Sequence, residues 1–338
     1  MRILAAGDHF VLDTLIGDAL EAAVTASPFE LTGLTLPWPL GPFGGVAEAD
    51  EAGDCEDALI EALRDVEVCV TRMAPFTERV LDASPALRLV VVCRGGGPDN
   101  VDVEAARARG VRVCFAPDRD AAAAAEFTVA MMLAAMRRIP EAHDSLARRG
   151  VWGGSYSTYE GCGFELEDTR VGLVGYGAVG SRVARVLSAF GAEVEVYDPY
   201  VRGDVHGVRV ASLDTLLSRS RVVTLHARLT DETRGLIGAR ELGLLPDSSV
   251  LVNVARGPLV DTGALCDALE SGRLAAAALD TYEQEPLPAG ARLRGVPGVV
   301  MTPRLGGASR QVAEKAARTA AAEVARYAAG APLAHCLT

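Results

Sequence analysis

A glycine-rich hexapeptide, Gly175-Tyr176-Gly177-Ala178-Val179-Gly180, closes an apolar run and opens a helical pattern. A second strand-like run follows the helical pattern and ends at Asp198. Glycines at this spacing allow a tight turn, close approach of backbone amides to a pyrophosphate, and packing of helix on strand. The helix N-terminus offers unpaired N–H groups to phosphates, and an acidic residue here accepts ribose hydroxyls and repels the extra phosphate of NADP. The sequence therefore predicts an NAD site that includes Gly175, Gly177, Ala178, Val179, Gly180 and Asp198.

Strand-like and helical patterns alternate along the chain on both sides of this motif. Strand-like runs at 3–5, 67–70, 89–92 and 111–115 alternate with helical stretches, and a second series runs from 171 to about 301. This βαβ alternation predicts an α/β fold with two doubly wound parallel-sheet domains. An alanine-rich helix at 121–138 separates the two series, and an irregular stretch spans 150–163.

A last helical stretch, 309–329, has no strand after it and is expected to return to the first domain. We therefore expect a Rossmann cofactor domain, residues 118–303, inserted into a flavodoxin-like substrate domain made of 1–117 and 304–338. In such sheets, ligands bind beyond the carboxyl ends of the strands.

Composition limits the possible partners. The formal net charge of −12 argues against nucleic acid and anionic membranes, and no apolar run is long enough to span a membrane. The chain begins directly with a strand-like run, and its seven cysteines are scattered singly without a C-x-x-C pair. This pattern predicts neither a metal site nor a disulfide framework, and it favours the reducing cytoplasm.

Two further segments resemble the D-isomer-specific 2-hydroxyacid dehydrogenase family. They are Asn253-Val254-Ala255-Arg256-Gly257-Pro258-Leu259-Val260-Asp261 and Ala278-Leu279-Asp280-Thr281-Tyr282-Glu283-Gln284-Glu285-Pro286-Leu287. Three other segments also resemble this family, so the similarity covers essentially the whole chain. They are residues 97–102, 125–127 and 225–230. The family includes phosphoglycerate dehydrogenase, glyoxylate/hydroxypyruvate reductase and NAD-sensing corepressors. The resemblance implies hydride transfer between NAD(H) and position 2 of a D-2-hydroxy or 2-oxo acid.

The resemblance also implies roles for individual residues. Arg256 matches the arginine that holds the substrate's carboxylate and keto oxygen, for which a planar fork of N–H donors is suited. Glu285 matches the glutamate that hydrogen-bonds to the catalytic histidine and favours its protonated form. Asp280 matches the aspartate that accepts a hydrogen bond from the nicotinamide carboxamide. Ala255 is expected to contact the cofactor. The backbone amides that meet the substrate carboxylate are expected from Gly95, Gly96 and Gly97.

One position departs from the family pattern. The family's Thr-Pro-His-x-Gly-Gly reads Thr302-Pro303-Arg304-Leu305-Gly306-Gly307, so Arg304 stands in place of the general acid/base histidine. An imidazole exchanges a proton near neutral pH, whereas a guanidinium stays protonated. Loss of a general acid costs about 10²–10⁴ in rate. We therefore expect Arg304 to form a fixed salt bridge with Glu285.

Three interpretations follow from this departure. In the favoured one, the protein is a dehydrogenase in which Arg304 stabilises the developing alkoxide, and the second cation beside Arg256 selects an oxo acid with an extra phospho or phosphono group. In the second, the chain is an NAD(H)-binding sensor or scaffold. In the third, His9 or His226 supplies the proton. Asp280, Arg256 and Glu285 favour the enzyme, because a pure NAD-binding module needs none of them. The variable end of the substrate is expected near Arg72, Arg94 and residues 156–159.

The alanine-rich helix also bears on assembly. Family resemblance places this helix and its neighbours at a twofold interface, so we expect a homodimer. We interpret its apolar face as part of that interface, with an internal core face as the alternative. The residues of this face are Phe127, Met131, Met132 and Ala135.

Overall fold

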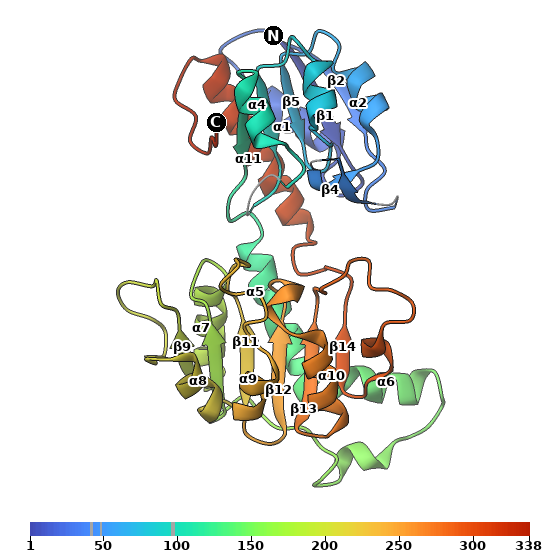
Figure 1. Ribbon diagram of the computed structural model, residues 1–338, viewed down its shortest axis with the longest axis vertical. Coiled ribbons are helices and arrows are strands. Elements are labelled where there is room, and N and C mark those ends of the chain that lie inside the picture. Colours follow the sequence, from blue (N-terminus) through green and yellow to red (C-terminus); the bar gives the residue numbers. More distant parts are fainter. Residues whose placement is uncertain (41–42, 48, 96–98) are drawn as a thin grey trace. The chain divides into compact units, whose positions relative to one another are not determined.

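The computed structural model describes residues 1–40, 43–47, 49–95 and 99–338, and these divide into two compact units (Figure 1). The first unit consists of residues 1–120 and 308–338, and the second of residues 121–307. By this division Arg304 belongs to the second unit. The domain limits at 117/118 and 303/304 stay a prediction.

The first unit is built on a parallel sheet with the strand order β2-β1-β5-β6-β7. Its strands are β1 (Arg2–Gly7), β2 (Glu30–Thr35), β5 (Val68–Thr71), β6 (Leu89–Val92) and β7 (Arg112–Phe115). In order of appearance this is 2-1-3-4-5, the flavodoxin-like order, which confirms the predicted fold. A separate antiparallel pair, β3 (Phe43–Val46) and β4 (Ala49–Gly53), lies outside this sheet.

Helices cover both faces of the first sheet because successive strand residues point to opposite faces. α1 (Asp13–Ala23) and α11 (Arg310–Ala328) pack on the face that carries Ile3 and Ala5. α2 (Glu56–Ala62), α3 (Glu78–Asp82) and α4 (Val103–Ala108) pack on the face of Leu4 and Ala6. The last helix therefore returns to the first unit, as the sequence predicts.

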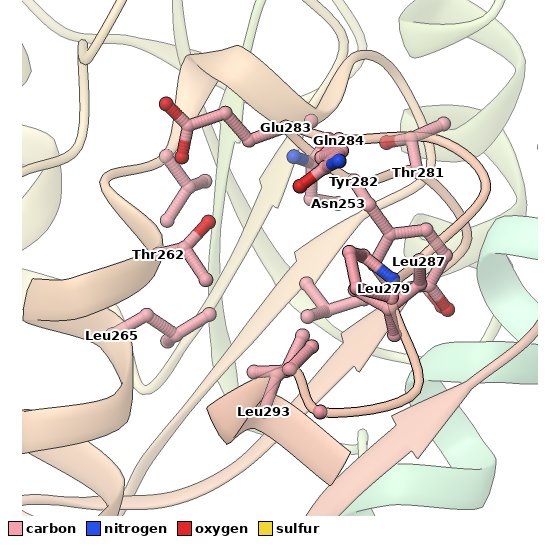
Figure 2. Close-up of a pocket in the computed structure, with 15 residues that line it drawn as sticks. Asn253, Thr262, Leu265, Leu279, Thr281, Tyr282, Glu283, Gln284, Leu287 and Leu293 are labelled. Atoms are coloured by element: carbon pink, nitrogen blue, oxygen red, sulfur yellow. The ribbon is translucent and has the colours of Figure 1, made fainter.

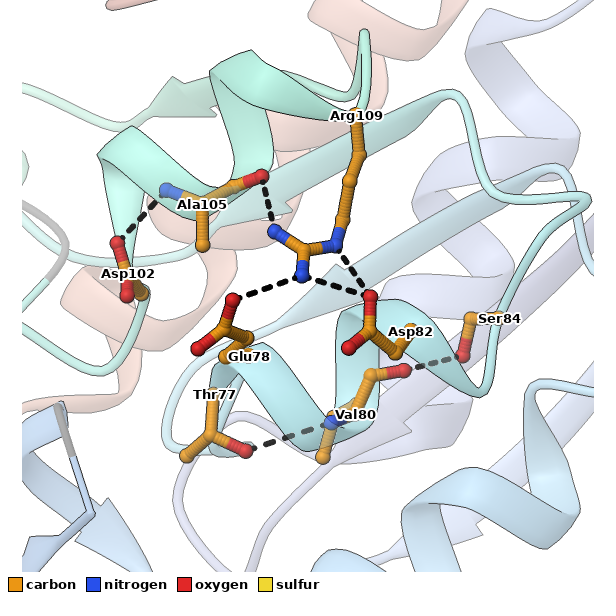
Figure 3. A network of polar contacts seen from close by, with 8 residues as sticks. All are labelled: Thr77, Glu78, Val80, Asp82, Ser84, Asp102, Ala105 and Arg109. Carbon is orange, nitrogen blue, oxygen red and sulfur yellow. Dashed lines mark hydrogen bonds and ion pairs between the residues drawn. The ribbon is translucent and has the colours of Figure 1, made fainter.

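Arg109, at the end of α4, ties this helix to α3 (Figure 3). Its Nε donates to Asp82 Oδ1 at 2.7 Å and its Nη2 to Glu78 Oε1 at 3.0 Å. Its Nη1 donates to the carbonyl of Ala105 at 3.0 Å. Each of the three guanidinium nitrogens thus has an acceptor, so Arg109 serves as a structural arginine.

The second unit contains a parallel sheet with the order β10-β9-β8-β11-β12-β13-β14. The strands are β8 (Arg170–Val174), β9 (Glu193–Tyr197), β10 (Val208–Arg209), β11 (Val222–Leu225), β12 (Ser249–Asn253), β13 (Leu274–Leu279) and β14 (Val299–Met301). The first six follow the Rossmann order 3-2-1-4-5-6, and β14 extends it by one strand. The strand order reverses between β8 and β11, which is where doubly wound sheets bind ligands.

The helices of the second unit also lie on both faces of its sheet (Figure 1). α8 (Leu213–Arg219), α9 (Ala239–Leu244) and α10 (Thr262–Glu270) pack on one face, together with the short helix η3 (Arg292–Gly295). The helix η2 (Gly257–Leu259) follows β12. α5 (Ala121–Met136) and α7 (Gly180–Ala189) pack on the other face.

The apolar face of α5 is an internal core face. Met131, Met132 and Ala135 are buried against the sheet of the second unit, and Phe127 packs against the same cluster. The expectation that this face forms a subunit interface is therefore wrong, because the chain's own strands cover it. After α5, α6 (Ile139–Ala147) and the short helix η1 (Gly154–Ser157) lead to β8, and this stretch exposes several large apolar side chains.

Candidate active site

The glycine motif forms the turn between β8 and α7. Gly175 has a φ of +94°, and a Cβ there would lie 2.7 Å from the backbone nitrogen of Ala227. A Cβ on Gly180 would lie 2.3 Å from the carbonyl oxygen of Gly175, so helix and strand pack closely only without a side chain. A Cβ on Gly177 would meet nothing within 4 Å. The three glycines thus match the turn, the open backbone and the close packing that a pyrophosphate site needs.

Asp198 lies directly after β9 and contacts this turn. Its Oδ2 accepts a hydrogen bond from the backbone N–H of Tyr176 at 2.7 Å. Its Oδ1 accepts from the backbone N–H groups of Tyr200 at 2.8 Å and Val201 at 3.1 Å. Backbone donors on both oxygens fix the carboxylate at the end of β9, the place from which such a group reaches an adenosine ribose.

Asn253, the last residue of β12, holds the loop that carries Arg256. Its side-chain nitrogen donates to the carbonyl of Arg256 at 2.8 Å, and its Oδ1 accepts from the N–H of Ala255 at 3.1 Å. Asn253 is buried, while Arg256 is exposed and donates from Nη1 to the neighbouring carbonyl of Ala255. The backbone is thus fixed, and among the described residues no carboxylate forms an ion pair with Arg256.

The carboxylate of Asp280, just after β13, organises the loop after β14. Its Oδ1 accepts from Thr302 Oγ1 at 2.6 Å and from the N–H of Leu305 at 2.7 Å, and its Oδ2 accepts from the N–H of Gly306 at 2.8 Å. The backbone N–H of Arg304 donates to the carbonyl of Asp280 at 3.1 Å. Asp280 therefore fixes the backbone on which Arg304 stands. Its predicted contact with nicotinamide stays a prediction.

Arg304 forms an ion pair with Glu285. Nη1 of Arg304 lies 2.8 Å from Glu285 Oε2, and Oε1 of Glu285 accepts from the N–H of Tyr282 at 2.8 Å. The side chain of Glu285 is 18% exposed and that of Arg304 is 32% exposed. Arg304 has a φ of +57°, a left-handed conformation that its backbone bonds to Asp280 and Thr302 hold in place. The pair leaves this position without a side chain that changes its protonation near neutral pH.

The loops after β12, β13 and β14 adjoin one another, because these strands are neighbours in the sheet. The N–H of Asp280 donates to the carbonyl of Asn253 at 3.1 Å, and a Cβ on Gly257 would lie 2.0 Å from the carbonyl carbon of Tyr282. Tyr282 donates its hydroxyl to the carbonyl of Thr302 at 2.9 Å. Burial, followed by the charge of Asp280, raises the pKa of Tyr282 to about 12. The loops of the site are thus held by three residues to which the sequence analysis gave no role. They are Asn253, Tyr282 and Thr302.

A cavity of about 470 Å³ lies under the loop that carries Glu285 (Figure 2). Thr262 and Leu265 of α10 form one wall, and Tyr282 and Leu287 lie opposite. Its lining includes none of Arg256, Glu285 and Arg304. The cavity therefore adjoins the loops of these groups through Gly257 and Gln284, but none of the three side chains lines it.

The two histidines considered as proton donors have different surroundings. Burial lowers the pKa of His226 to about 4, and its Nε2 lies 3.1 Å from Thr224 Oγ1. His226 is consequently neutral at pH 7 and carries no proton to donate as an imidazolium. His9 lies after β1 in the first unit, is exposed, and donates its backbone N–H to the carbonyl of Trp38.

The predicted carboxylate loop is only partly described. Gly96 and Gly97 lie outside the described residues. Gly95 is described, and a Cβ added to it would lie 3.3 Å from the carbonyl oxygen of Ala116. Arg72 and Arg94, both in the first unit, lie at the carboxyl edge of its sheet and are considered below. No three His, Cys, Asp or Glu side chains gather into a possible metal site within the described ranges. Over the same ranges, no helix has the length and apolarity to cross a membrane.

A Rossmann-type sheet, its glycine turn and an acidic residue after the second strand define an NAD-binding α/β protein. Residues 129–306 match the family described as D-isomer specific 2-hydroxyacid dehydrogenase, NAD binding domain. The chain belongs to this family, and NAD is its cofactor.

Relatives with assigned activities are similar over most of this chain. D-3-phosphoglycerate dehydrogenase of Methanocaldococcus jannaschii is 39% identical over 284 residues, which cover 82% of this chain and 53% of that protein. Glyoxylate reductase of Thermofilum pendens is 37% identical over 281 residues, covering 82% of each. The chain thus spans about half the length of the first relative. The crystal structure of the TT0316 protein from Thermus thermophilus has a TM-score of 0.82 and 29% identity over all of both chains.

Proposed function

We propose that this protein reduces a 2-oxo acid to a D-2-hydroxy acid with NADH, and catalyses the reverse reaction with NAD. The observation that carries the proposal is the grouping of the loops that bear Arg256, Glu285 and Arg304 beyond three adjacent strands of the NAD-binding sheet. A module that only binds NAD needs the glycine turn and Asp198, and it gains nothing from this second set of residues.

Each residue has a distinct part in the proposed reaction. Bound NADH supplies the hydride. The exposed guanidinium of Arg256 binds the carboxylate of the oxo acid through paired N–H donors. Arg304, oriented by Glu285, donates a hydrogen bond to the C2 oxygen, whose negative charge grows as the C–H bond forms. Because Arg304 keeps its proton, the alkoxide takes its proton from water.

This protonation route has a cost and a benefit. Losing a general acid slows the reaction by about 10²–10⁴ relative to a histidine enzyme. A permanent cation on the loop adjoining Arg256 adds affinity for a second anionic group. We therefore propose that the preferred substrate is an oxo acid with an extra phospho or phosphono group.

A spectrophotometric screen tests the proposal. NADH oxidation would be followed with glyoxylate, hydroxypyruvate, dicarboxylic oxo acids and phosphorylated or phosphono oxo acids. We expect turnover with at least one compound and its loss in the variant Arg256→Ala. If none is reduced although NADH binds, the enzyme proposal is wrong.

That second outcome would favour a sensor or scaffold that binds NAD(H). The specific observation in favour of this alternative is that the Arg304–Glu285 pair occupies the position of the proton donor, while His226 is neutral at pH 7. Calorimetry with NAD and NADH, read together with the turnover screen, separates the two, because a sensor binds the cofactor and reduces no oxo acid.

We further propose that the protein is a homodimer of the reducing cytoplasm. All seven cysteines are free thiols, which supports such a compartment. The stretch from the start of α6 to Tyr159, just beyond η1, exposes apolar side chains that a second subunit would cover. They are Ile139 at 53%, Leu146 at 54%, Val151 at 53%, Trp152 at 86% and Tyr159 at 93% exposure.

A further inference from the structure

Three arginines follow three adjacent strands of the first unit's sheet. Arg72 comes directly after β5, Arg94 follows β6, and Arg119 lies beyond the end of β7. These strands are parallel neighbours in which Thr71 pairs with Val92 and Val92 with Phe115. All three arginines therefore leave the carboxyl edge of the sheet, where open α/β sheets bind ligands.

Contacts between the loops bring the three arginines together. Nη1 of Arg94 lies 3.6 Å from the sulfur of Met73, the residue after Arg72. The N–H of Ala116 donates to the carbonyl of Arg94 at 2.9 Å, and a Cβ on Gly95 would lie 3.3 Å from the carbonyl oxygen of Ala116. Arg94 is thus placed between the loop of Arg72 and the segment that leads to Arg119.

These side chains are buried, and several of their donors lack acceptors. The side chain of Arg72 is 13% exposed, and its guanidinium carbon lies 3.7 Å from the ring centre of Trp38. Arg119 is 9% exposed and Arg94 is 8% exposed. Nε of Arg72, and both Nε and Nη1 of Arg119, are buried without a hydrogen-bond partner in the part of the chain that the structure describes. Leaving charged donors buried and unpaired is unfavourable unless an acceptor binds there.

Nearby carboxylates balance this charge only in part. Asp8 Oδ2 lies 3.4 Å from Nη1 of Arg72, while Asp8 Oδ1 accepts from two backbone N–H groups. Asp99 pairs with Arg94 at 3.2 Å. Arg119 forms no ion pair with a described residue. Burial, and then the charges of Arg119 and Arg94, lower the pKa of Arg72 to about 10 despite Asp8, so Arg72 remains charged at pH 7 and its two arginine neighbours oppose that charge.

The contrast with Arg109 separates this cluster from a structural arginine. Arg109 has an acceptor for each guanidinium nitrogen and two carboxylate partners (Figure 3). Arg119 has two buried donors without a partner among the described residues, and burial lowers its pKa although the charge of Asp120 opposes this effect. The first arrangement satisfies every donor of its arginine, whereas the second leaves buried donors that an added anion would satisfy.

We propose that Arg72, Arg94 and Arg119 form an anion-binding site of the first unit, and that it binds a phosphoryl or phosphonyl group. A tetrahedral dianion presents several acceptor oxygens and matches forked guanidinium donors better than a single carboxylate does. Anion binding by this cluster does not depend on the proposed function.

Calorimetry and thermal unfolding test the site without turnover. The probes are 2-phosphoglycolate, glycolate and inorganic phosphate, with potassium chloride at equal ionic strength as the salt control. We expect phosphoglycolate to bind about 100-fold more tightly than glycolate, and phosphate to raise the Tm. Arg119→Gln should weaken phosphoglycolate binding about 10- to 100-fold and leave glycolate within about threefold. The matched control is Arg64→Gln, which removes a charge from a side chain 74% exposed in the same unit and should change neither affinity.

Stability without ligand distinguishes a ligand site from a structural cluster. If the site awaits an anion, Arg119→Gln removes a repelling cation, so the Tm in chloride should stay the same or rise while the increase with phosphate disappears. A lower Tm in chloride with an unchanged phosphate effect would overturn the proposal. So would phosphoglycolate binding no tighter than glycolate binding in the wild type. Arg72→Gln provides an independent variant with the same expected loss.

The NADH assay keeps this proposal separate from the proposed function. Turnover of oxo acids without any effect of phosphate or of Arg119→Gln would overturn the anion site and leave the enzyme assignment in place. Anion binding lost in Arg119→Gln, in a protein that reduces no oxo acid, would support the site and overturn the assigned reaction.

Discussion

Glu285 Oε2 lies 2.8 Å from Arg304 Nη1, and the other oxygen of the same carboxylate accepts the N–H of Tyr282. Glu285 thus joins the loop after β13 to the loop after β14 through one carboxylate. A histidine at position 304 would receive the same carboxylate as a partner and would gain a titratable proton.

We predict that Arg304→His creates activity towards glyoxylate or hydroxypyruvate, raising kcat/KM by about 10²-fold or more over the wild type. The new activity should require the imidazolium, whose pKa the Glu285 carboxylate raises above its ordinary value. The rate of oxo-acid reduction by this variant should therefore fall as pH rises through that pKa. The pH profile of the wild type should not show this decrease. Adding Glu285→Gln to Arg304→His should shift this decrease in rate to lower pH.

The same variant tests whether Arg304 selects charge. The wild-type kcat/KM should rise along a series of oxo acids with one, two and three negative charges, and Arg304→His should lose turnover of the most anionic member. Steady-state kinetics over the series gives the answer. A wild type that treats all members alike would contradict recruitment of Arg304 for a highly charged substrate.

Cofactor preference should depend on Asp198. We predict that the wild type binds NADH more tightly than NADPH by roughly tenfold or more, because the carboxylate repels the 2′-phosphate. Asp198→Ala should narrow this difference, and Asp198→Asn should narrow it while keeping an acceptor for the N–H of Tyr176. Calorimetry with both cofactors measures the ratio. Tighter binding of NADPH by the wild type would show that the prediction is wrong.

Gly257 should be intolerant of a side chain. A Cβ there would lie 2.0 Å from the backbone of Tyr282, so Gly257→Ala must separate the loops that carry Arg256 and Glu285. We expect a loss of about 1–3 kcal/mol in the free energy of unfolding and a higher KM. Gly243→Ala, in α9 with nothing within 4 Å of the added Cβ, is the control and should be neutral or stabilising. Urea denaturation of both variants tests the difference.

His226 should contribute to acid sensitivity. The imidazole titrates near 6.5 when unfolded, and burial lowers its pKa to about 4 in the native state. The unfolded state therefore binds more protons between these values, so stability is lost as pH falls from about 6.5 to about 4. His226→Gln should flatten this part of the profile, while the exposed His206→Gln should not. Equal slopes for the two variants in urea titrations would refute the assignment.

Apolar patterns in the sequence predicted most strands of the two sheets, and the structure explains where these predictions held and where they failed. The strands β5, β6, β8 and β12 are buried and mainly apolar, and such segments predict parallel strands directly. β2 was missed because it is a sheet edge whose residues are mainly exposed or half-buried, so it lacks such a run. The face of α5 was misassigned because an apolar stripe has the same pattern whether it meets its own sheet or a partner.

The sequence identified candidate site residues, and it did not predict most of the contacts that these residues make. Asp280, Glu285 and Arg304 were identified by motif, and the Arg304–Glu285 pair follows from the charges that the motif places together. The three hydrogen bonds that Asp280 accepts were not predictable. Their donors lie in the loop after β14, which only the tertiary structure places beside Asp280. Arg119 was missed because it lies beyond the end of β7, in a segment without periodicity, and only the burial of its donors marks it.

The return of α11 to the first unit has a consequence for synthesis on the ribosome. One face of the first sheet is covered by α1 and α11, so Ala313, Ala317 and Val324 complete a core whose strands were all made before residue 121. The second unit contains its entire core within 121–307 and can fold as soon as it has emerged. The nascent first unit meanwhile exposes an apolar sheet face, which makes it the segment that chaperones must protect until the last helix arrives.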